Sequence, residues 1–248
     1  MRIVHRRPQD YLVAVLFLIV TAALVYACLY VWNKRKDIPP VDVSAYEVKG
    51  IDVSSHNGEI DFEKVRKAGM EFVFIKASEG ETFRDAMFER NFDEARRAGL
   101  AVGAYHFFRY DKQGIEQAVN LYHALNGRIP ELGVVIDLED EGNPEGVDPD
   151  VIIRNVEEMI DYLNLRGLTV TFYTNKDGYN QFLRNAYAGH PLWICSFTQQ
   201  PIDAEWRFWQ YSHTGRVDGI QGDVDLNVYK GSAKEWADFL ELARPLPL

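Results

Sequence analysis

Short apolar runs rich in β-branched residues recur along the chain from residue 48 onward. Runs of this length and composition are typical of buried β-strands. Eight of them can be identified: 48–53, 71–77, 100–107, 133–138, 168–174, 191–197, 208–211 and 224–229. Stretches with helical spacing lie between several of these runs, at 61–68, 86–98, 114–125 and 149–166. Each ends at or near a glycine, which can adopt the left-handed conformation that closes a helix.

The alternation of strands and helices predicts a parallel sheet, and eight strands favour closure into a barrel over an open sheet. No helical pattern is evident between Trp193 and Val224, so we expect an irregular (β/α)8-type, TIM-like α/β barrel. The segment 50–54 after the first strand lacks the second and third glycines of a dinucleotide-binding fingerprint. A nucleotide-binding fold therefore loses support.

An apolar stretch of 22 residues without a formal charge, 11–32, precedes this pattern. About 20 apolar residues are enough to cross a bilayer as a helix, so the stretch predicts one N-terminal transmembrane anchor. The alternatives are a cleaved signal sequence and a lipidated Cys28, but the apolar run continues past both cleavage positions. The expected organisation is a short basic segment at 1–10, an anchor or signal sequence at 11–32, a linker at 33–46 and a catalytic barrel domain at 47–248.

The remainder of the chain is acidic. Of the 27 basic and 37 acidic residues, six basic and one acidic lie within residues 1–36, so residues 37–248 carry a net charge of −15. Such a surface argues against nucleic-acid binding, which needs a basic footprint. Cys28 lies in the apolar stretch and Cys195 alone in the barrel, which excludes a disulfide within that domain.

Four acidic residues lie at or near strand ends: Asp52, Asp137, Glu139 and Asp225. In a barrel of parallel strands the active site forms at the carboxyl ends of the strands. Strand side chains alternate, so Asp137 and Glu139 share one face, with Cα atoms about 6.5–7 Å apart. Any one of these acids alone could be a helix cap or an ion-pair partner. Two carboxyls on one inward face repel each other and lose solvation, which raises pKa values and indicates a functional site.

Aromatic residues accompany the acids near the ends of the later strands. Alternate members of the groups 105–107, 172–174 and 209–211, together with Trp193, would face the barrel mouth. Core packing is the simpler explanation for Phe107, Phe172 and Phe208. Aromatic faces beside carboxylates nevertheless suit a sugar site, and the candidates for substrate binding are Tyr105, Tyr173, Trp193 and Trp209.

Motifs at five strands occur in one order: Gly-Ile-Asp-Val-Ser at 50–54, Gly-Ala-Tyr-His-Phe at 103–107, Asp-Leu-Glu at 137–139, Phe-Tyr-Thr at 172–174 and Phe-Trp-Gln-Tyr-Ser at 208–212. Together with the run 217–227, this order resembles the glycoside hydrolase family 25 muramidases, the Chalaropsis-type lysozymes. The resemblance extends from about residue 49 to residue 229. The sixth strand departs from it, with Cys195, Ser196 and Phe197 where relatives often carry Ala followed by an aromatic residue or Arg.

The resemblance implies hydrolysis of the β-1,4 bond between N-acetylmuramic acid and N-acetylglucosamine in peptidoglycan, with net retention and without a cofactor or metal. It implies that Glu139 is the general acid, that Asp137 is the second catalytic carboxyl, and that Asp52 and Asp225 complete the site. Asp137 either attacks the anomeric carbon or orients the 2-acetamido group of the substrate. Gln210 and Asn227, which lie in the matching motifs, join the substrate-binding candidates.

Other functions stay open on the sequence. A metal-dependent hydrolase using His56 and His106 lacks a recognisable ligand spacing. A membrane-tethered, catalytically inactive glycan-binding module would not need Glu139 beside Asp137, and a hydrolase of a related glycan is a further alternative. Because peptidoglycan lies outside the cytoplasmic membrane, we expect a single-pass protein of that membrane with an extracytoplasmic barrel. The expected partners are glycan strands and, through the anchor, the membrane; no obligate protein partner is evident.

Overall fold

The computed structural model describes residues 15–27, 29, 41–184, 187, 189–202 and 204–243. Residues 41–248 belong to one compact unit. Val41, Val43 and Tyr46, at the start of this unit, pack against its hydrophobic core. Ordered packing therefore begins within the range 33–46 that the sequence predicted to be a linker.

The predicted transmembrane helix is not found. Among the described residues, 15–27 are helical, and no described helix is both long and apolar enough to cross a membrane. The prediction of a single-pass anchor over 11–32 is wrong, and so is the cytoplasmic-membrane location inferred from it; the membrane contact through this anchor is not supported. Positions 11–14, 28 and 30–40, including the lipidation candidate Cys28, lie outside the described residues.

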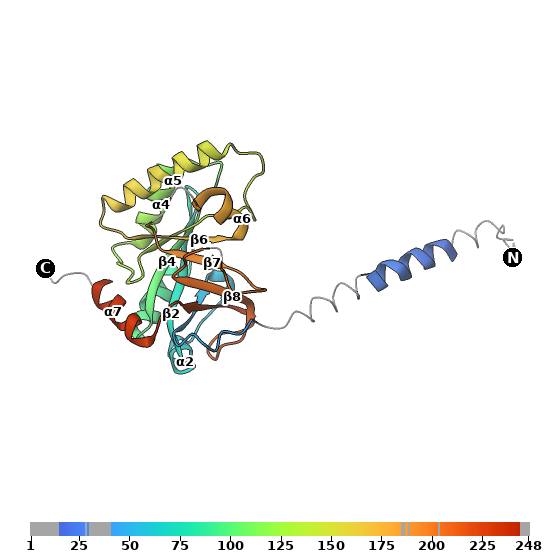
Figure 1. The fold of residues 1–248 in the computed structure, drawn as a ribbon, viewed down its shortest axis with the longest axis horizontal. Coiled ribbons are helices and arrows are strands. Elements are labelled where there is room, and N and C mark those ends of the chain that lie inside the picture. Colours follow the sequence, from blue (N-terminus) through green and yellow to red (C-terminus); the bar gives the residue numbers. More distant parts are fainter. Residues whose placement is uncertain are drawn as a thin grey trace, which may run out of the picture. The chain divides into compact units, whose positions relative to one another are not determined.

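Eight strands close into a barrel, as the alternating pattern predicted (Figure 1). Neighbouring strands follow the order β1-β9-β8-β7-β6-β5-β4-β2, and β1 also pairs with β2, which closes the ring. A short further strand, β3 (Phe83–Arg84), pairs antiparallel with the end of β2. The barrel strands are β1 (Lys49–Val53), β2 (Met70–Glu79), β4 (Ala101–Phe107), β5 (Val134–Asp137), β6 (Val170–Asn175), β7 (Leu192–Cys195), β8 (Phe208–Gly215) and β9 (Val224–Tyr229).

Strand β9 runs antiparallel to both of its neighbours, β1 and β8. A parallel strand would need a crossover of about a dozen residues or more. The connection 216–223 is shorter and turns at Gly219 (φ 102°) and Gly222 (φ 90°). The antiparallel direction brings the first residues of β9 to the barrel end where β1 finishes.

Helices lie outside the strands (Figure 1). In α5, the Asp148 side chain accepts a hydrogen bond from the Asp150 amide and Pro149 occupies the first turn, both of which favour helix initiation. Gly167, just beyond α5, has a φ of 73° and ends the helical path. The four predicted helices are α2 (Phe62–Lys67), α3 (Phe88–Arg97), α4 (Gly114–Leu125) and α5 (Pro149–Asn164). The sequence pattern missed η1 (Ser55–Asn57), α6 (Lys176–Gly178), η2 (Tyr179–Leu183) and α7 (Ala233–Ala243).

Helix α7 closes the barrel end opposite the carboxyl ends of the parallel strands. Its Trp236 ring lies 5.5 Å from the Phe72 ring and 5.1 Å from the Tyr229 ring, measured between centroids. Phe72 is near the start of β2, and Tyr229 is the last residue of the antiparallel β9. One end of the barrel is thus plugged by aromatic packing, which leaves the other end for a site.

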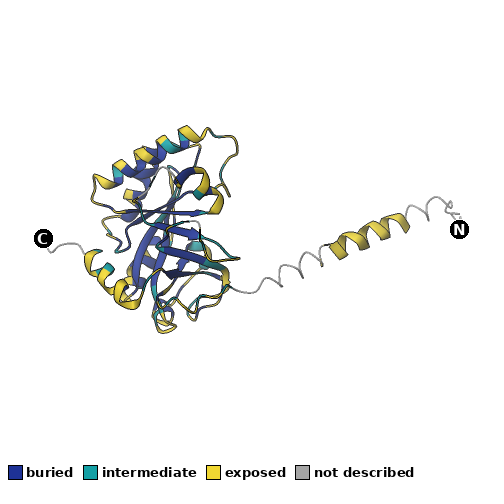
Figure 2. Ribbon diagram, viewed as in Figure 1, coloured by how far each residue is buried: buried dark blue, intermediate teal, exposed yellow. Residues whose placement is uncertain are grey.

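Two hydrophobic clusters lie on the two faces of the strands. The outer cluster joins strands to helices, and the inner cluster fills the barrel. The strands are largely buried, whereas the helices around them also carry exposed residues (Figure 2). In the inner cluster, Phe74 stacks on Trp193 with ring centroids 4.3 Å apart and meets Phe208 edge-on at 5.0 Å. A Cβ at Gly103 would lie 2.2 Å from the Phe74 ring, so that strand position needs glycine to make room.

The Phe74 packing gives a stability prediction. We expect Phe74→Ala to lower the free energy of unfolding by about 3–5 kcal/mol, because it opens a cavity at the centre of a closed barrel. Phe83→Ala is the matched control: Phe83 is 49% exposed, and its loss should cost less than about 1 kcal/mol. Urea unfolding followed by tryptophan fluorescence measures both, and equal losses would contradict the central role of Phe74.

Candidate active site

The predicted acids lie together at the open end of the barrel. Asp52 and Asp225 are register partners on the neighbouring strands β1 and β9. Asp137 is the last residue of β5, and Glu139 follows two positions later. The negative charges of Asp52 and Glu139 both act on Asp137, and that of Asp225 acts on Glu139. All four carboxyls therefore form one electrostatic cluster.

Asp52 is held by two side-chain amides. It is 7% exposed, and its Oδ2 accepts hydrogen bonds from Gln210 Nε2 at 2.9 Å and from Asn227 Nδ2 at 2.8 Å. Each amide is anchored in turn by an aromatic residue, since Tyr173 donates to Gln210 Oε1 and Trp193 Nε1 donates to Asn227 Oδ1, both at 2.8 Å. Four of the six predicted substrate-binding residues thus form a network around Asp52.

Burial raises the pKa values of Asp52 and Asp225, and the charge of Asp225 adds to the rise at Asp52. Burial is the main cause for Asp52, followed by the negative charge of Asp225, while hydrogen bonds from Asn227 and Gln210 oppose the rise. Burial also raises the pKa of Asp225, against a hydrogen bond with Asp52. Two such carboxyls in contact favour sharing one proton over ionising together.

Asp137 is buried with one oxygen unpaired. Its side chain is 6% exposed, and Oδ1 has no hydrogen-bond partner among the residues that the structure describes. Burial and the charge of Glu139 raise the Asp137 pKa well above its ordinary value, while the Lys76 ammonium lowers it. Buried polar oxygens are usually paired, so Oδ1 is available for a group that the bare protein does not supply.

Glu139 is half-buried just beyond β5, in a loop held by Asn143. Asn143 Nδ2 donates to the backbone carbonyl oxygens of Glu139 and Phe108, both at 2.9 Å. Burial raises the pKa of Glu139 to about 7, and the charges of Glu141 and Asp140 add to the rise. At neutral pH a substantial fraction of Glu139 is therefore protonated and able to donate that proton.

Lys76 is a site residue that the sequence analysis missed. Its Nζ lies 2.8 Å from Glu79 Oε2 and over the Phe83 and Phe107 rings, at 5.5 and 5.4 Å from their centroids. Its positive charge favours the ionised forms of Asp137 and Glu139. The signal was present, because Lys76 lies two positions after the inward-facing Phe74 on one strand.

The other predicted aromatic residues divide between two sides of the strands. The Tyr105 ring meets Trp193 edge-on at 6.3 Å, and Tyr105 packs against the inner cluster. Trp209 lies in the outer cluster instead, fully buried, where Nε1 donates to the Ser196 carbonyl at 2.8 Å and the ring meets Tyr46 at 5.9 Å. The structure thus does not bring Trp209 to the acids.

The histidines considered as metal ligands also point elsewhere. His106 is fully buried, and its ring nitrogens interact with Ser78 Oγ at 2.8 Å and Gln117 Oε1 at 3.2 Å, the latter from the outer helix α4. Burial lowers the pKa of His106 to about 4. His56 Nδ1 lies 3.1 Å from Ser54 Oγ, in the short helix η1. Neither histidine takes part in the hydrogen bonds around Asp52.

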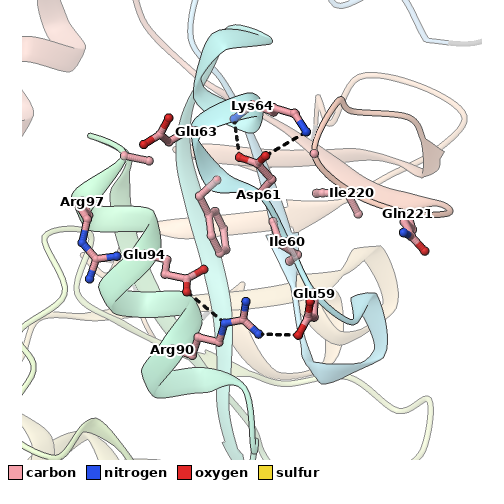
Figure 3. Close-up of a pocket in the computed structure, with 13 residues that line it drawn as sticks. Glu59, Ile60, Asp61, Glu63, Lys64, Arg90, Glu94, Arg97, Ile220 and Gln221 are labelled. Atoms are coloured by element: carbon pink, nitrogen blue, oxygen red, sulfur yellow. Dashed lines mark hydrogen bonds and ion pairs between the residues drawn. The ribbon is translucent and has the colours of Figure 1, made fainter.

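A depression of about 760 Å³ between α2, α3 and the turn at Gly219 shares no lining residue with the acid cluster (Figure 3). Several of the charged side chains that line it form ion pairs with one another. Arg90 contacts Glu59 at 3.1 Å and Glu94 at 3.0 Å, and Lys64 contacts Asp61 at 3.0 Å. The predicted acids therefore lie at the barrel mouth and not in this depression.

Residues 51–220 match the model of the glycosyl hydrolases family 25. The chain belongs to glycosyl hydrolase family 25. It is 36% identical to the autolytic lysozyme of Clostridium acetobutylicum over 73% of this chain, and spans 56% of that protein's length. It is also 36% identical to Lysozyme M1 of Streptomyces globisporus, over 80% of this chain and 72% of that protein.

A solved structure agrees with the assignment. The family 25 glycosyl hydrolase from Bacillus anthracis superposes with a TM-score of 0.73 at 32% identity, covering 79% of this chain and 95% of that one. The predictions of a family 25 protein and of a glycoside hydrolase are confirmed.

The raised pKa of Glu139 in this family 25 enzyme makes stability depend on pH. The folded protein holds the Glu139 proton up to about pH 7, whereas an unfolded glutamate releases it near pH 4.3. The stabilising effect of the proton is therefore complete below about pH 4.3 and is lost as the pH rises through 7. We expect Glu139→Gln to match the parent near pH 4 and to be more stable than the parent at pH 8, by about 1–3 kcal/mol.

Urea unfolding at both pH values measures this difference. The control is Glu158→Gln, on an exposed position of α5, which should leave the difference between the two pH values unchanged. If Glu139→Gln were only as stable as the parent at pH 8, or less stable, burial would not disfavour the ionised form of Glu139.

Proposed function

We propose that this family 25 enzyme is a muramidase, which hydrolyses the β-1,4 bond between N-acetylmuramic acid and N-acetylglucosamine in peptidoglycan. One observation carries the proposal: Glu139 has a pKa raised to about 7 and stands beside the buried Asp137, whose Oδ1 is unpaired. Glycoside hydrolysis needs one carboxylic acid that keeps its proton and a second carboxyl that acts on the sugar. The lysozyme names of the relatives support the choice of glycan.

In the first step Glu139 donates its proton to the glycosidic oxygen as the bond to the anomeric carbon breaks. Asp137 supports the positive charge that develops on the sugar, either by attacking the anomeric carbon or by orienting the 2-acetamido group to attack. Either role needs a free carboxylate oxygen, and Asp137 Oδ1 is one. Glu139, now ionised, then takes a proton from the water that completes hydrolysis, and two displacements at one carbon retain its configuration.

Asp52 and Asp225 complete the acidic cluster. Their proximity disfavours a second full negative charge beside Asp137 and adds to the rise in the Glu139 pKa through Asp225. Tyr105 packs against the inner cluster and is partly exposed, so it can offer a ring face to the substrate. Burial raises the pKa of the nearby Cys195 thiol to about 12, which keeps it protonated and makes it unsuitable as a nucleophile.

The acid assignment is tested with Glu139→Gln. We expect the parent protein to release fragments with reducing N-acetylmuramic acid from purified peptidoglycan, and the variant to lose at least about 1,000-fold in rate, because the leaving oxygen then lacks the proton that Glu139 donates. A reducing-end assay with mass spectrometry of the products measures this, and Glu158→Gln should keep the parent rate. A folded parent protein that binds the glycan without cleaving it would replace the enzyme with a binding module.

The pH dependence tests the same assignment independently. Since the protonated form of Glu139 is required, kcat/KM should fall above about pH 7, by about tenfold per pH unit. Removing a neighbouring negative charge with Glu141→Gln should move this fall to lower pH by less than about one unit. Initial rates measured between pH 4.5 and 9 test this pH dependence, and a rate that continues to rise above pH 8 would contradict the role of Glu139.

A further inference from the structure

The orientation of Asn227 is determined by a group that can only donate. The indole Nε1 of Trp193 donates to Asn227 Oδ1 at 2.8 Å. Because an indole N–H has no acceptor capacity, the oxygen of the amide must face it. The amide NH2 group is then directed at Asp52 Oδ2, 2.8 Å away.

Gln210 faces Asp52 with its amide NH2 group as well, here opposite a hydroxyl donor. The Tyr173 hydroxyl donates to Gln210 Oε1 at 2.8 Å, and Gln210 Nε2 donates to the same oxygen of Asp52 at 2.9 Å. Tyr173 pairs with Trp193 in the β6–β7 register, and Gln210 pairs with Asn227 in the β8–β9 register, so the two donors lie on neighbouring strands and so do the two amides. Two aromatic donors thus direct two amides toward one carboxylate oxygen.

An oxygen that accepts two N–H hydrogen bonds at this depth is kept free of a proton. A proton held by the Asp52–Asp225 pair must therefore lie on Asp52 Oδ1 or on Asp225. We propose that Tyr173 and Trp193 are positioning residues which, acting through Gln210 and Asn227, hold Asp52 Oδ2 unprotonated, so that the proton shared by the two carboxyls is confined to Asp52 Oδ1 and Asp225. This inference rests on the proposed function and gives these residues a task other than contacting the sugar.

The hydrogen bonds to Asp52 predict the direction in which its titration midpoint should shift. Without the Tyr173 hydroxyl, the Gln210 amide can rotate and turn its oxygen toward Asp52, an arrangement that favours the protonated carboxyl. The ionisable groups that face Asp52 and its partner Asp225 come from the surrounding strands and the loop after β5: Lys76, Tyr105, Asp137, Glu139, Tyr173, Cys195, His213 and Asp225. Tyr173→Phe changes no charge among them, so a shift in the Asp52 titration midpoint reports a rotation of the Gln210 amide.

The first experiment follows the aspartate carboxyl carbons by 13C NMR in the full chain, with Asp52 assigned from the signal lost in Asp52→Asn. We expect the Asp52 titration midpoint to rise by at least about half a pH unit in Tyr173→Phe and in Trp193→Phe. Tyr187→Phe, whose hydroxyl contacts the Ile153 carbonyl at 3.4 Å, is the control and should leave the midpoint in place. An unchanged midpoint in Tyr173→Phe overturns the inference.

Trp193→Phe also weakens the stacking on Phe74, so its folding is checked by thermal unfolding. If it does not fold, Tyr173→Phe carries the test, because that change removes a single oxygen atom. The titration needs no substrate and therefore remains decisive even if the parent protein releases no reducing ends, which would refute the proposed function alone.

The second experiment separates positioning from sugar binding. We expect Tyr173→Phe to lower kcat on peptidoglycan about tenfold while KM stays within about twofold, because the substrate keeps its contacts and the acid cluster loses its proton arrangement. A raised KM with unchanged kcat and an unchanged Asp52 titration would mean that the Tyr173 hydroxyl binds the sugar directly, and would overturn the inference.

Discussion

The antiparallel pairing of β9 with β1 is the constraint on which the site depends. It closes the barrel and sets Asp225 opposite Asp52. It also brings Asn227, two positions along the same face, to Asp52 Oδ2. With β9 in the parallel direction, its first residues would lie at the other end of the barrel, where α7 packs. The acid cluster is therefore a product of strand direction as much as of residue identity.

Burial then gives two neighbouring carboxyls different chemistry. Asp137 ends a strand within the barrel and keeps one oxygen unpaired, whereas Glu139 lies two positions further out, in a loop bound by Asn143. Glu139 is surrounded by negative charges and has a pKa raised to about 7, and the Lys76 ammonium opposes the rise at both carboxyls. Glu139 is the less buried of the two carboxyls, so its proton is the one that a leaving group can reach.

The layers of the barrel connect stability to this chemistry. Trp193 stacks on Phe74 in the inner cluster and at the same time donates its indole hydrogen to Asn227. Tyr173 packs against Trp193 at 4.5 Å and donates to Gln210. The aromatic core thus lies next to the acids. The Tyr173 hydroxyl and the Trp193 indole N–H supply the hydrogen bonds that orient the two amides in contact with Asp52. A cluster of buried carboxyls is unfavourable on its own, and the well-packed layer below it provides the rigidity that keeps it in place.

Local patterns in the sequence determined much of this protein. Period-two alternation put Asp137 and Glu139 on one face, and glycines marked the helix ends, because both signals depend on neighbouring residues alone. The same alternation could not tell which of the adjacent residues Trp209 and Gln210 faces inward, and only the register with β9 decided it. The uncharged stretch 11–32 likewise indicated a membrane span, but no described helix is long and apolar enough to cross a membrane. The direction of β9, the plug formed by α7 and the orientation of Gln210 and Asn227 arose from contacts between segments up to about 175 positions apart, which no local period encodes.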